Sequence, residues 1–223
     1  MKVYKKFEAY IIILYEKQMN SETLNSLLTV LKLPEFVEIK SDENFVIDLK
    51  YASSDNFMGE NVYHEFNRAF LHKIAAEKLF AAAAKLKSKK SNYKFIIYDV
   101  LRPRSVQWKM WNKVKGTYQQ QYIANPENGS NHNFGMAVDL SILNESGELL
   151  DMGTGFDEFD ERSQPKYEEK FYLEKKLTLS HIENRNLLRD CMENSGFKQL
   201  STEWWHFDAL PRTEIRAGYK IVE

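Results

Sequence analysis

Hydrophobic and polar positions along this 223-residue chain follow two periods, one typical of strands and one of helices. Residues 45–51 alternate as a half-buried strand does, and residues 94–100 form a strongly β-prone run. Residues 136–142 form a short apolar strand, and the aromatic run at 203–208 favours one more. The pattern therefore predicts at least four strands, and they are scattered through the sequence.

Helical patterns occur between these strands. We expect one helix over residues 4–17 and a second that Ser21 caps and Pro34 ends. The second helix has one apolar stripe, made by Leu24, Leu27, Leu28 and Leu31. We read this N-terminal segment as a packing or contact surface, because it contains no candidate chemistry.

Three further helices are expected, together with the loops that join them. The helices are an alanine-rich one over residues 65–87, one from Arg102-Pro103 to Gly116 carrying Val106, Trp108 and Trp111, and one over 184–194 that stops before Gly196. Residues 119–129 are expected to be a loop, 144–147 a hairpin turn, and the Lys/Glu-rich stretch 166–176 a solvated helix or loop.

Strands and helices mixed without regular βαβ alternation indicate the α+β class. The length suits one domain, or two small ones. We expect a single small domain over residues 41–223, with helices flanking the sheet, preceded by an N-terminal helical extension over residues 1–40.

Composition narrows the possible partners. The net charge of −1 gives no basic surface for nucleic acid and no obvious attraction to anionic membranes, and a small polar or zwitterionic substrate fits this balance as well as any other. Cys191 is the single cysteine, which rules out an internal disulfide and a cysteine-based zinc site. No run reaches the roughly 20 apolar residues of a membrane span. The short apolar run 9–15 lacks a cleavage site after it, so we expect a helix rather than a signal peptide, and a cytoplasmic protein with a periplasmic one as the alternative.

The segment Ser130-Asn-His-Asn-Phe-Gly-Met-Ala-Val-Asp139 is the first candidate for chemistry. Gly135 and Val138 favour a loop that leads into a strand, with His132 on the loop and Asp139 on the strand. A loop residue and a strand residue can converge on one metal ion, and Gly135 allows a sharp turn between them. The alternative is an unrelated surface histidine and strand-end aspartate.

The segment Glu203-Trp-Trp-His206 is the second candidate. Two histidines and one carboxylate can hold zinc and leave a position for water, and a further glutamate can move the proton of that water. In a strand, Glu203 and His206 point to opposite faces, so a shared site requires the strand to end or twist there. The alternative is a hydrophobic strand with polar edges.

Arg102 directly follows a buried-looking strand, a common place for a functional residue. It suits the stabilisation of an oxyanion, and the alternative is a structural ion pair with Asp99.

Other candidates are set aside. His64-Glu65 begins a helical zinc motif whose second histidine is replaced by Arg68.

Three more residues have structural interpretations only. We expect His72 at the surface or at the edge of the core, and His181 as a helix cap. Cys191 shares a stripe with Leu187 and Leu188, which favours a buried, inert thiol.

The two candidate segments, taken together, resemble the zinc D-alanyl-D-alanine dipeptidases of the vancomycin-resistance type, within a wider family of zinc D,D-peptidases. Further matching segments occur in the family's order, and the resemblance covers about residues 46–209. These segments are Asp55-Asn-Phe-x-Gly59, Tyr98-Asp99-x-x-Arg102-Pro103, Gly147-Glu-Leu, Met152-Gly153-x-x-Phe156-Asp157, Asp160-Glu-Arg-Ser163 and Met192-Glu-Asn-Ser-Gly-Phe197.

The resemblance implies a role for each matching residue. One zinc ion per chain would be held by His132, Asp139 and His206, with Glu203 as catalytic base and Arg102 stabilising the transition state. It also implies that Asp157 meets the substrate's ammonium, that Ser130 lies near its C-terminal side, and that Asp99 holds the arginine. The implied fold is a small α+β domain with a central antiparallel sheet, and the implied reaction is hydrolysis of D-alanyl-D-alanine.

The chain also departs from the family pattern. Leu101 stands where an aromatic residue is common, residues 166–176 match poorly, and the first 40 residues include an extension that the family does not need. Two alternatives therefore remain: a D,D- or L,D-carboxypeptidase acting on peptidoglycan peptides, and a non-catalytic zinc-binding module on the same fold. The oligomeric state stays open.

Overall fold

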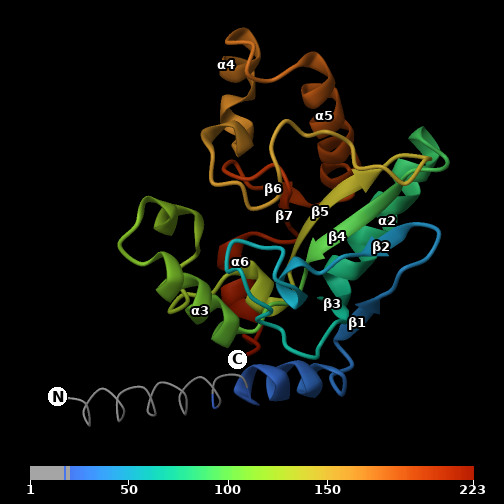
Figure 1. Cartoon of the computed structure of the whole chain (residues 1–223). Helices are drawn as coiled ribbons and strands as arrows, with labels where there is room; N and C mark the ends of the chain where they lie inside the picture. The colour runs from blue at the N-terminus through green and yellow to red at the C-terminus, as the bar shows by residue number, and fades with distance from the viewer. Residues whose placement is uncertain (1–17, 19–20) are drawn as a thin grey trace.

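The computed structural model describes residue 18 and residues 21–223 (Figure 1). The expected helix over residues 4–17 lies outside this part of the chain. The α-helices are α2 (Lys73–Lys89), α3 (Arg104–Val114), α4 (Glu168–Leu173), α5 (Leu179–Glu193) and α6 (Arg212–Gly218), together with a helix over residues 21–30. The strands are β1 (Phe36–Ile39), β2 (Phe45–Ile47), β3 (Ala69–His72), β4 (Lys94–Asp99), β5 (Ala137–Leu143), β6 (Lys198–Gln199) and β7 (His206–Asp208).

The central sheet has five strands in the order β2-β4-β5-β7-β6, and β1 and β3 form a separate antiparallel pair. The expected α+β class is confirmed. Within the central sheet β2 and β4 pair in parallel, while the remaining neighbours are antiparallel. The parallel pair needs a long crossover, which β3 and α2 supply.

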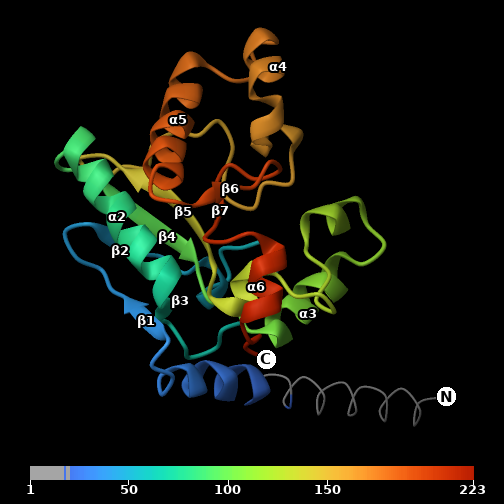
Figure 2. The same ribbon diagram turned by 180° about the vertical axis from the view of Figure 1, so that it is seen from behind.

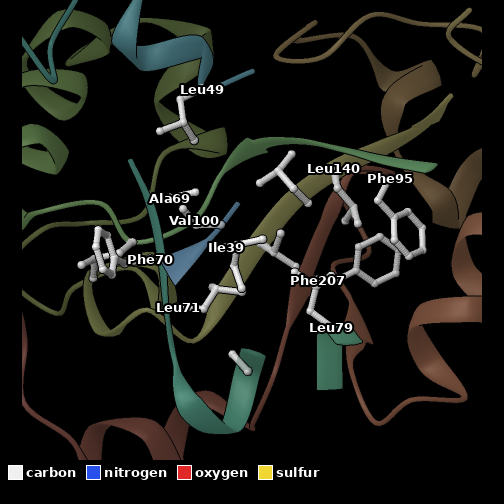
Figure 3. Packing of buried hydrophobic residues seen from close by; sticks show 14 of the residues in the cluster. Ile39, Leu49, Ala69, Phe70, Leu71, Leu79, Phe95, Val100, Leu140 and Phe207 are labelled. Atoms are coloured by element: carbon white, nitrogen blue, oxygen red, sulfur yellow. The ribbon is translucent and has the colours of Figure 1, made fainter. Parts of the chain in front are cut away.

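The main core lies between α2 and the sheet. Leu79 of α2 is fully buried in one cluster with Phe95, Leu140 and Phe207 from three adjacent strands (Figure 3). Alternate positions on each strand therefore face α2. The positions between them face the other side, where Ile96 and Tyr98 form a smaller apolar cluster with Leu143.

The expected helix over residues 65–87 begins too early, because residues 69–72 are β3. Phe70 and Leu71 are buried and pair with β1, so α2 starts only at Lys73. His72 is buried as the N-cap of α2, where its Nδ1 accepts a hydrogen bond from the backbone N–H of Ile74. Pairing with a strand 30 residues upstream outweighs the helical propensity of this stretch.

The N-terminal helix differs from its expected apolar stripe. Leu27 and Val30 are buried in the core, whereas Leu28 and Leu31 are exposed. Residues 21–40 therefore pack against the rest of the described chain, since β1 also pairs with β3. The division into a 1–40 extension and a 41–223 domain stays a prediction.

The other expected elements need smaller corrections. The expected loop over 119–129 contains a 3-10 helix, Tyr118–Tyr122. The stretch over 166–176 is not simply solvated, because α4 lies within it and buries Phe171. In the expected strand over residues 203–208, only His206–Asp208 is a strand. Within the described residues, no helix is long and apolar enough to span a membrane.

Candidate active site

Neighbouring strands and one turn bring three potential metal ligands together. Asp139 of β5 lies opposite His206 of β7 in the antiparallel register. His132 lies just before β5, in a 3-10 turn formed by Asn131–Phe134. His132 Nε2, His206 Nδ1 and Asp139 Oδ1 lie 2.9–3.3 Å from one another. The structure thus joins the halves of the two candidate segments into one buried cluster.

The backbone around Gly135 holds the turn that carries His132. Gly135 has a φ of 64°, and a Cβ there would lie 2.8 Å from a ring carbon of Phe36 and 2.9 Å from the backbone nitrogen of His72. Any other residue is therefore both strained and crowded. Ser130 and Asn133 close the start of the turn as a reciprocal capping box. Ser130 thus has a structural role here besides lining the pocket.

Hydrogen bonds on the outer side of each imidazole define which nitrogen faces the cluster. His132 Nδ1 lies 2.6 Å from the carbonyl oxygen of Val100, and His206 Nε2 lies 2.9 Å from Oδ1 of Asp208. A carbonyl and an ionised carboxylate only accept, so these nitrogens carry the protons in the neutral rings. His132 Nε2 and His206 Nδ1, which face each other at 3.1 Å, then each carry a lone pair and no proton. Two lone pairs aimed at one point suit a cation between them.

The size of the cluster fits a tetrahedral metal ion. Zinc bonds to histidine nitrogen and carboxylate oxygen are about 2.0–2.2 Å long, so two tetrahedral ligands are about 3.3–3.5 Å apart. The observed separations of 2.9–3.3 Å lie close to that value. Burial raises the pKa of Asp139, but the two imidazoles beside it lower this pKa more, so its carboxyl is ionised. The donor set therefore fits a divalent ion with a fourth position open.

Glu203 stands next to this cluster without belonging to it. It precedes β7 in a non-strand segment, which removes the difficulty that residues three apart in a strand face opposite ways. Its Oε2 lies 3.8 Å from His206 Nδ1, and its side chain is 13% exposed. Burial raises the pKa of Glu203 to about 7. A carboxyl with this pKa suits proton transfer near neutral pH.

Arg102 is buried and held from two sides. Its Nε and Nη2 donate to Oδ2 of Asp99 at 2.8 and 2.5 Å, and its Nη1 donates to Oε1 of Gln107 at 2.9 Å. Tyr63 donates to the other oxygen of Asp99. A β-bulge in β4 between Ile97 and Asp99 brings Asp99 opposite Asp139. The structural ion pair and the functional arginine are thus compatible, because the pair aims the guanidinium at the cluster.

Asp157 lies at another wall of the same pocket. Tyr51 donates a 2.7 Å hydrogen bond to its Oδ2. Burial raises the pKa of Asp157 well above its usual range, even though the bond from Tyr51 lowers it, because the charge of Asp139 adds to the effect. Asp157 also has a φ of 57°, a strained conformation for a residue other than glycine. A half-buried carboxyl that forms no ion pair with any described residue suits the binding of a positively charged group.

These side chains line one pocket of about 260 Å³. Its wall includes several residues that sequence reasoning missed, among them Tyr51, Gln107, Tyr122, Asn131 and Arg212. Asp208, which orients His206, was missed as well. A carboxylate two residues after a strand histidine shares its face, so that spacing was a usable signal for Asp208.

The remaining histidines and the cysteine lie apart from this pocket. His181 closes a capping box with Thr178 at the start of α5, as expected. Cys191 is fully buried, and burial raises the pKa of its thiol, which agrees with an inert side chain. His64 lies in the segment before β3 and is not part of the metal-ligand cluster.

Comparison with known proteins agrees with this geometry. Residues 31–219 match the peptidase family described as D-Ala-D-Ala dipeptidase. The chain is 37% identical over 176 residues to the D-alanyl-D-alanine dipeptidase of Escherichia coli strain K12, covering 79% of this chain and 82% of the relative. It is 33% identical over 180 residues to the enzyme of that name from Enterococcus faecium, covering 72% and 83%. For the one from Enterococcus faecalis the identity is 32% over 181 residues, covering 73% and 85%.

Proposed function

The chain belongs to the D-Ala-D-Ala dipeptidase family of metallopeptidases, and on that premise we propose that it hydrolyses D-alanyl-D-alanine with one bound zinc ion. The observation that carries the proposal is the triangle of His132, Asp139 and His206 with Glu203 beside it. Histidine and carboxylate ligands with an open fourth position are typical of catalytic zinc. A zinc ion held there supplies Lewis acidity, which acidifies a water molecule and polarises the peptide carbonyl.

Glu203 is proposed as the group that moves the proton. Its carboxylate takes a proton from the attacking water and then returns it to the amine of the leaving D-alanine. Burial supports this double role, because it raises the pKa of this carboxyl in the metal-free protein to about 7 and so makes it a stronger base than an exposed glutamate. Trp205 lines the pocket beside Glu203 and limits access of bulk water.

Arg102 is proposed to stabilise the negative charge that develops on the peptide oxygen. Three of its five N–H groups donate to Asp99 and Gln107, and Nη2 also faces Oδ2 of the ligand Asp139 at 3.7 Å, so the guanidinium presents N–H groups to the metal-ligand cluster. The guanidinium is therefore oriented before substrate arrives, and donors remain for the developing oxyanion. Asp99 acts as the residue that holds this arginine.

Asp157 is proposed to select substrates with a free ammonium group. In the free enzyme burial favours its neutral form, and an arriving ammonium provides the missing countercharge. An internal peptide nitrogen carries no charge and offers no such gain. A requirement for this ammonium therefore favours a dipeptide over a longer peptide. Ser130, on the pocket wall, is proposed to lie near the substrate's C-terminal side.

A panel of peptides tests this function on the purified protein with zinc quantified. D-Ala-D-Ala should be cleaved and L-Ala-L-Ala should not, and N-acetyl-D-Ala-D-Ala should react far more slowly than the free dipeptide. Equal rates on the acetylated and free peptides would favour the carboxypeptidase alternative. Thorough chelation should abolish turnover and zinc should restore it, so activity that survives chelation would refute the metal assignment.

A further inference from the structure

The Glu203 carboxylate accepts no hydrogen bond from any residue of the described chain. Its Oε2 lies 3.8 Å from His206 Nδ1, and its backbone N–H makes only a long 3.4 Å bond to the carbonyl of Leu200. The position of the carboxylate is therefore determined by the backbone and by the packing of the residues beside it. In particular, it depends on what holds Trp204, the next residue along the chain.

Trp204 is held at three separate atoms. Its backbone N–H donates to the carbonyl of Ser163 at 3.0 Å, and its carbonyl accepts from Nε2 of Gln199 at 2.8 Å. Its indole Nε1 donates to Oγ1 of Thr154 at 2.9 Å. Trp204 is 2% exposed, whereas Thr154 and Gln199 are half-buried, so the tryptophan end of each bond is shielded from water. We call Thr154, Ser163 and Gln199, with the bonds they make to Trp204, the Trp204 clamp.

Two arginines of α5 anchor the clamp. Arg185 is fully buried, donates from Nε to the carbonyl of Met152 at 2.7 Å, and reaches Oγ1 of Thr154 at 3.5 Å. Arg189, one turn later, donates from Nε to Oε1 of Gln199 at 2.6 Å. Thr154 and Gln199, the two clamp residues that bind Trp204 through their side chains, are thus each contacted by a guanidinium.

Both arginines share the carboxylate of Glu168, at the start of α4. Arg189 Nη2 lies 2.8 and 2.7 Å from its two oxygens, and Arg185 Nη1 lies 3.3 Å from one of them. Figures 1 and 2 show α4 and α5 side by side, beyond the β6–β7 end of the sheet. A connected set of polar contacts therefore runs from this helical pair to the segment that carries Glu203. It includes the stretch over 166–176, where the resemblance to the family is weakest.

We propose that the α4–α5 pair positions the Glu203 carboxylate through the Trp204 clamp, with Thr154 and Gln199 as positioning residues. The proposal rests on the proposed function, in which Glu203 moves the proton. A displacement of about 1 Å is enough to cost about 100-fold in rate when a catalytic group loses its alignment. A purely structural role would instead change the fraction of folded protein and leave the turnover of each zinc-loaded molecule unchanged.

The test compares Thr154→Val with Thr154→Ser in the zinc-loaded full chain. Valine keeps the shape of threonine and removes the hydroxyl, whereas serine keeps the hydroxyl and removes a methyl group. Leu187→Ala is the control on α5, because Leu187 is a half-buried core contact outside the clamp. Turnover of D-Ala-D-Ala per bound zinc, KM, unfolding by urea and hydrogen exchange of the indole N–H are measured for all four proteins.

We expect Thr154→Val to lower kcat at least 10-fold with KM and zinc content unchanged, and to expose the Trp204 indole proton to exchange. Thr154→Ser should restore both properties, and Leu187→Ala should lose stability without losing kcat. Wild-type kcat in Thr154→Val, or an equal loss in Leu187→Ala, would overturn the proposal.

Crystal structures of the zinc-loaded wild type and Thr154→Val separate this proposal from the proposed function. The Glu203 carboxylate should move relative to His206 in the variant, whatever the substrate is. An unmoved carboxylate would overturn the positioning role. Inactivity of the wild type on D-Ala-D-Ala would overturn the proposed function and leave this structural comparison valid.

Discussion

The Glu203→Gln variant is expected to keep its zinc, to lose turnover and to gain stability when it is metal-free. Gln has the shape of Glu but neither accepts nor releases a proton, and it does not replace any of the three ligand atoms. A general acid–base group contributes about 10²–10⁴ in rate, so kcat should fall by about that factor. KM for D-Ala-D-Ala should change little, because Asp157 and Arg102 remain in place.

The gain in stability follows from the burial of Glu203. Burial raises its pKa from 4.5 to about 7, and such a rise corresponds to about 3 kcal/mol. Because the folded pKa lies above the unfolded one, the ionised residue costs nothing below about pH 4.5, and the cost is complete above about pH 7. Metal-free Glu203→Gln should therefore exceed wild type by less than about 1 kcal/mol near pH 5 and by about 3 kcal/mol at pH 8.

Urea unfolding of chelated protein at pH 5 and pH 8 measures this difference. Metal analysis and D-Ala-D-Ala hydrolysis on the zinc-loaded proteins measure the other two effects. Glu183→Gln is a matched control, because Glu183 lies exposed on α5 and its replacement should change stability by less than about 0.5 kcal/mol. Undiminished turnover in Glu203→Gln would refute the proposed role of this residue. A stability difference that does not grow with pH would refute its burial as an ionisable group.

Other predictions concern the ligands, the arginine and the pH dependence. His206→Ala should lose both zinc and turnover, because it removes one ligand of three, and a variant that still holds one zinc per chain by metal analysis would contradict the ligand set. Arg102→Lys should lower kcat by about 10²–10³, with less effect on KM. One ammonium cannot make the bonds to Asp99 and Gln107 and also donate to the substrate. An unchanged kcat in steady-state kinetics on D-Ala-D-Ala would argue against this role. The value of kcat/KM should fall as pH drops, because Glu203 must be ionised to accept a proton. The midpoint of this fall should be no higher than about pH 7, because bound zinc favours the ionised carboxylate. A profile that stays flat down to pH 4.5 would contradict this.

Local sequence patterns predicted the strands whose own residues are strongly apolar and β-prone. Residues 94–100 and 136–142 were expected as strands and correspond to β4 and β5. The strand β3 was missed, because its four residues carry a helical pattern and become a strand only by pairing with β1. The strand β7 was expected three residues too long, since both tryptophans are buried outside the strand and only the carbonyl of Trp205 accepts a bond from β5, from the N–H of Leu140.

The candidate site was predicted in its residue types and only partly in its geometry. Resemblance to a family pointed to His132, Asp139, His206 and Glu203, and the structure brings these four side chains together. Residue spacing alone predicted opposite faces for Glu203 and His206. The early end of the strand removes this conflict.

The residue types alone supply the chemical groups: imidazoles, carboxylates and an arginine, in an order typical of one peptidase family. How each group is held depends on tertiary contacts. The carbonyl of Val100 orients His132, the bulge in β4 places Asp99 opposite Asp139, and the Trp204 clamp holds the segment of Glu203. These supports are backbone carbonyls, strand registers and side chains tens of residues away. Such supports leave no local pattern in a sequence, because any residue supplies a carbonyl and register depends on pairing partners.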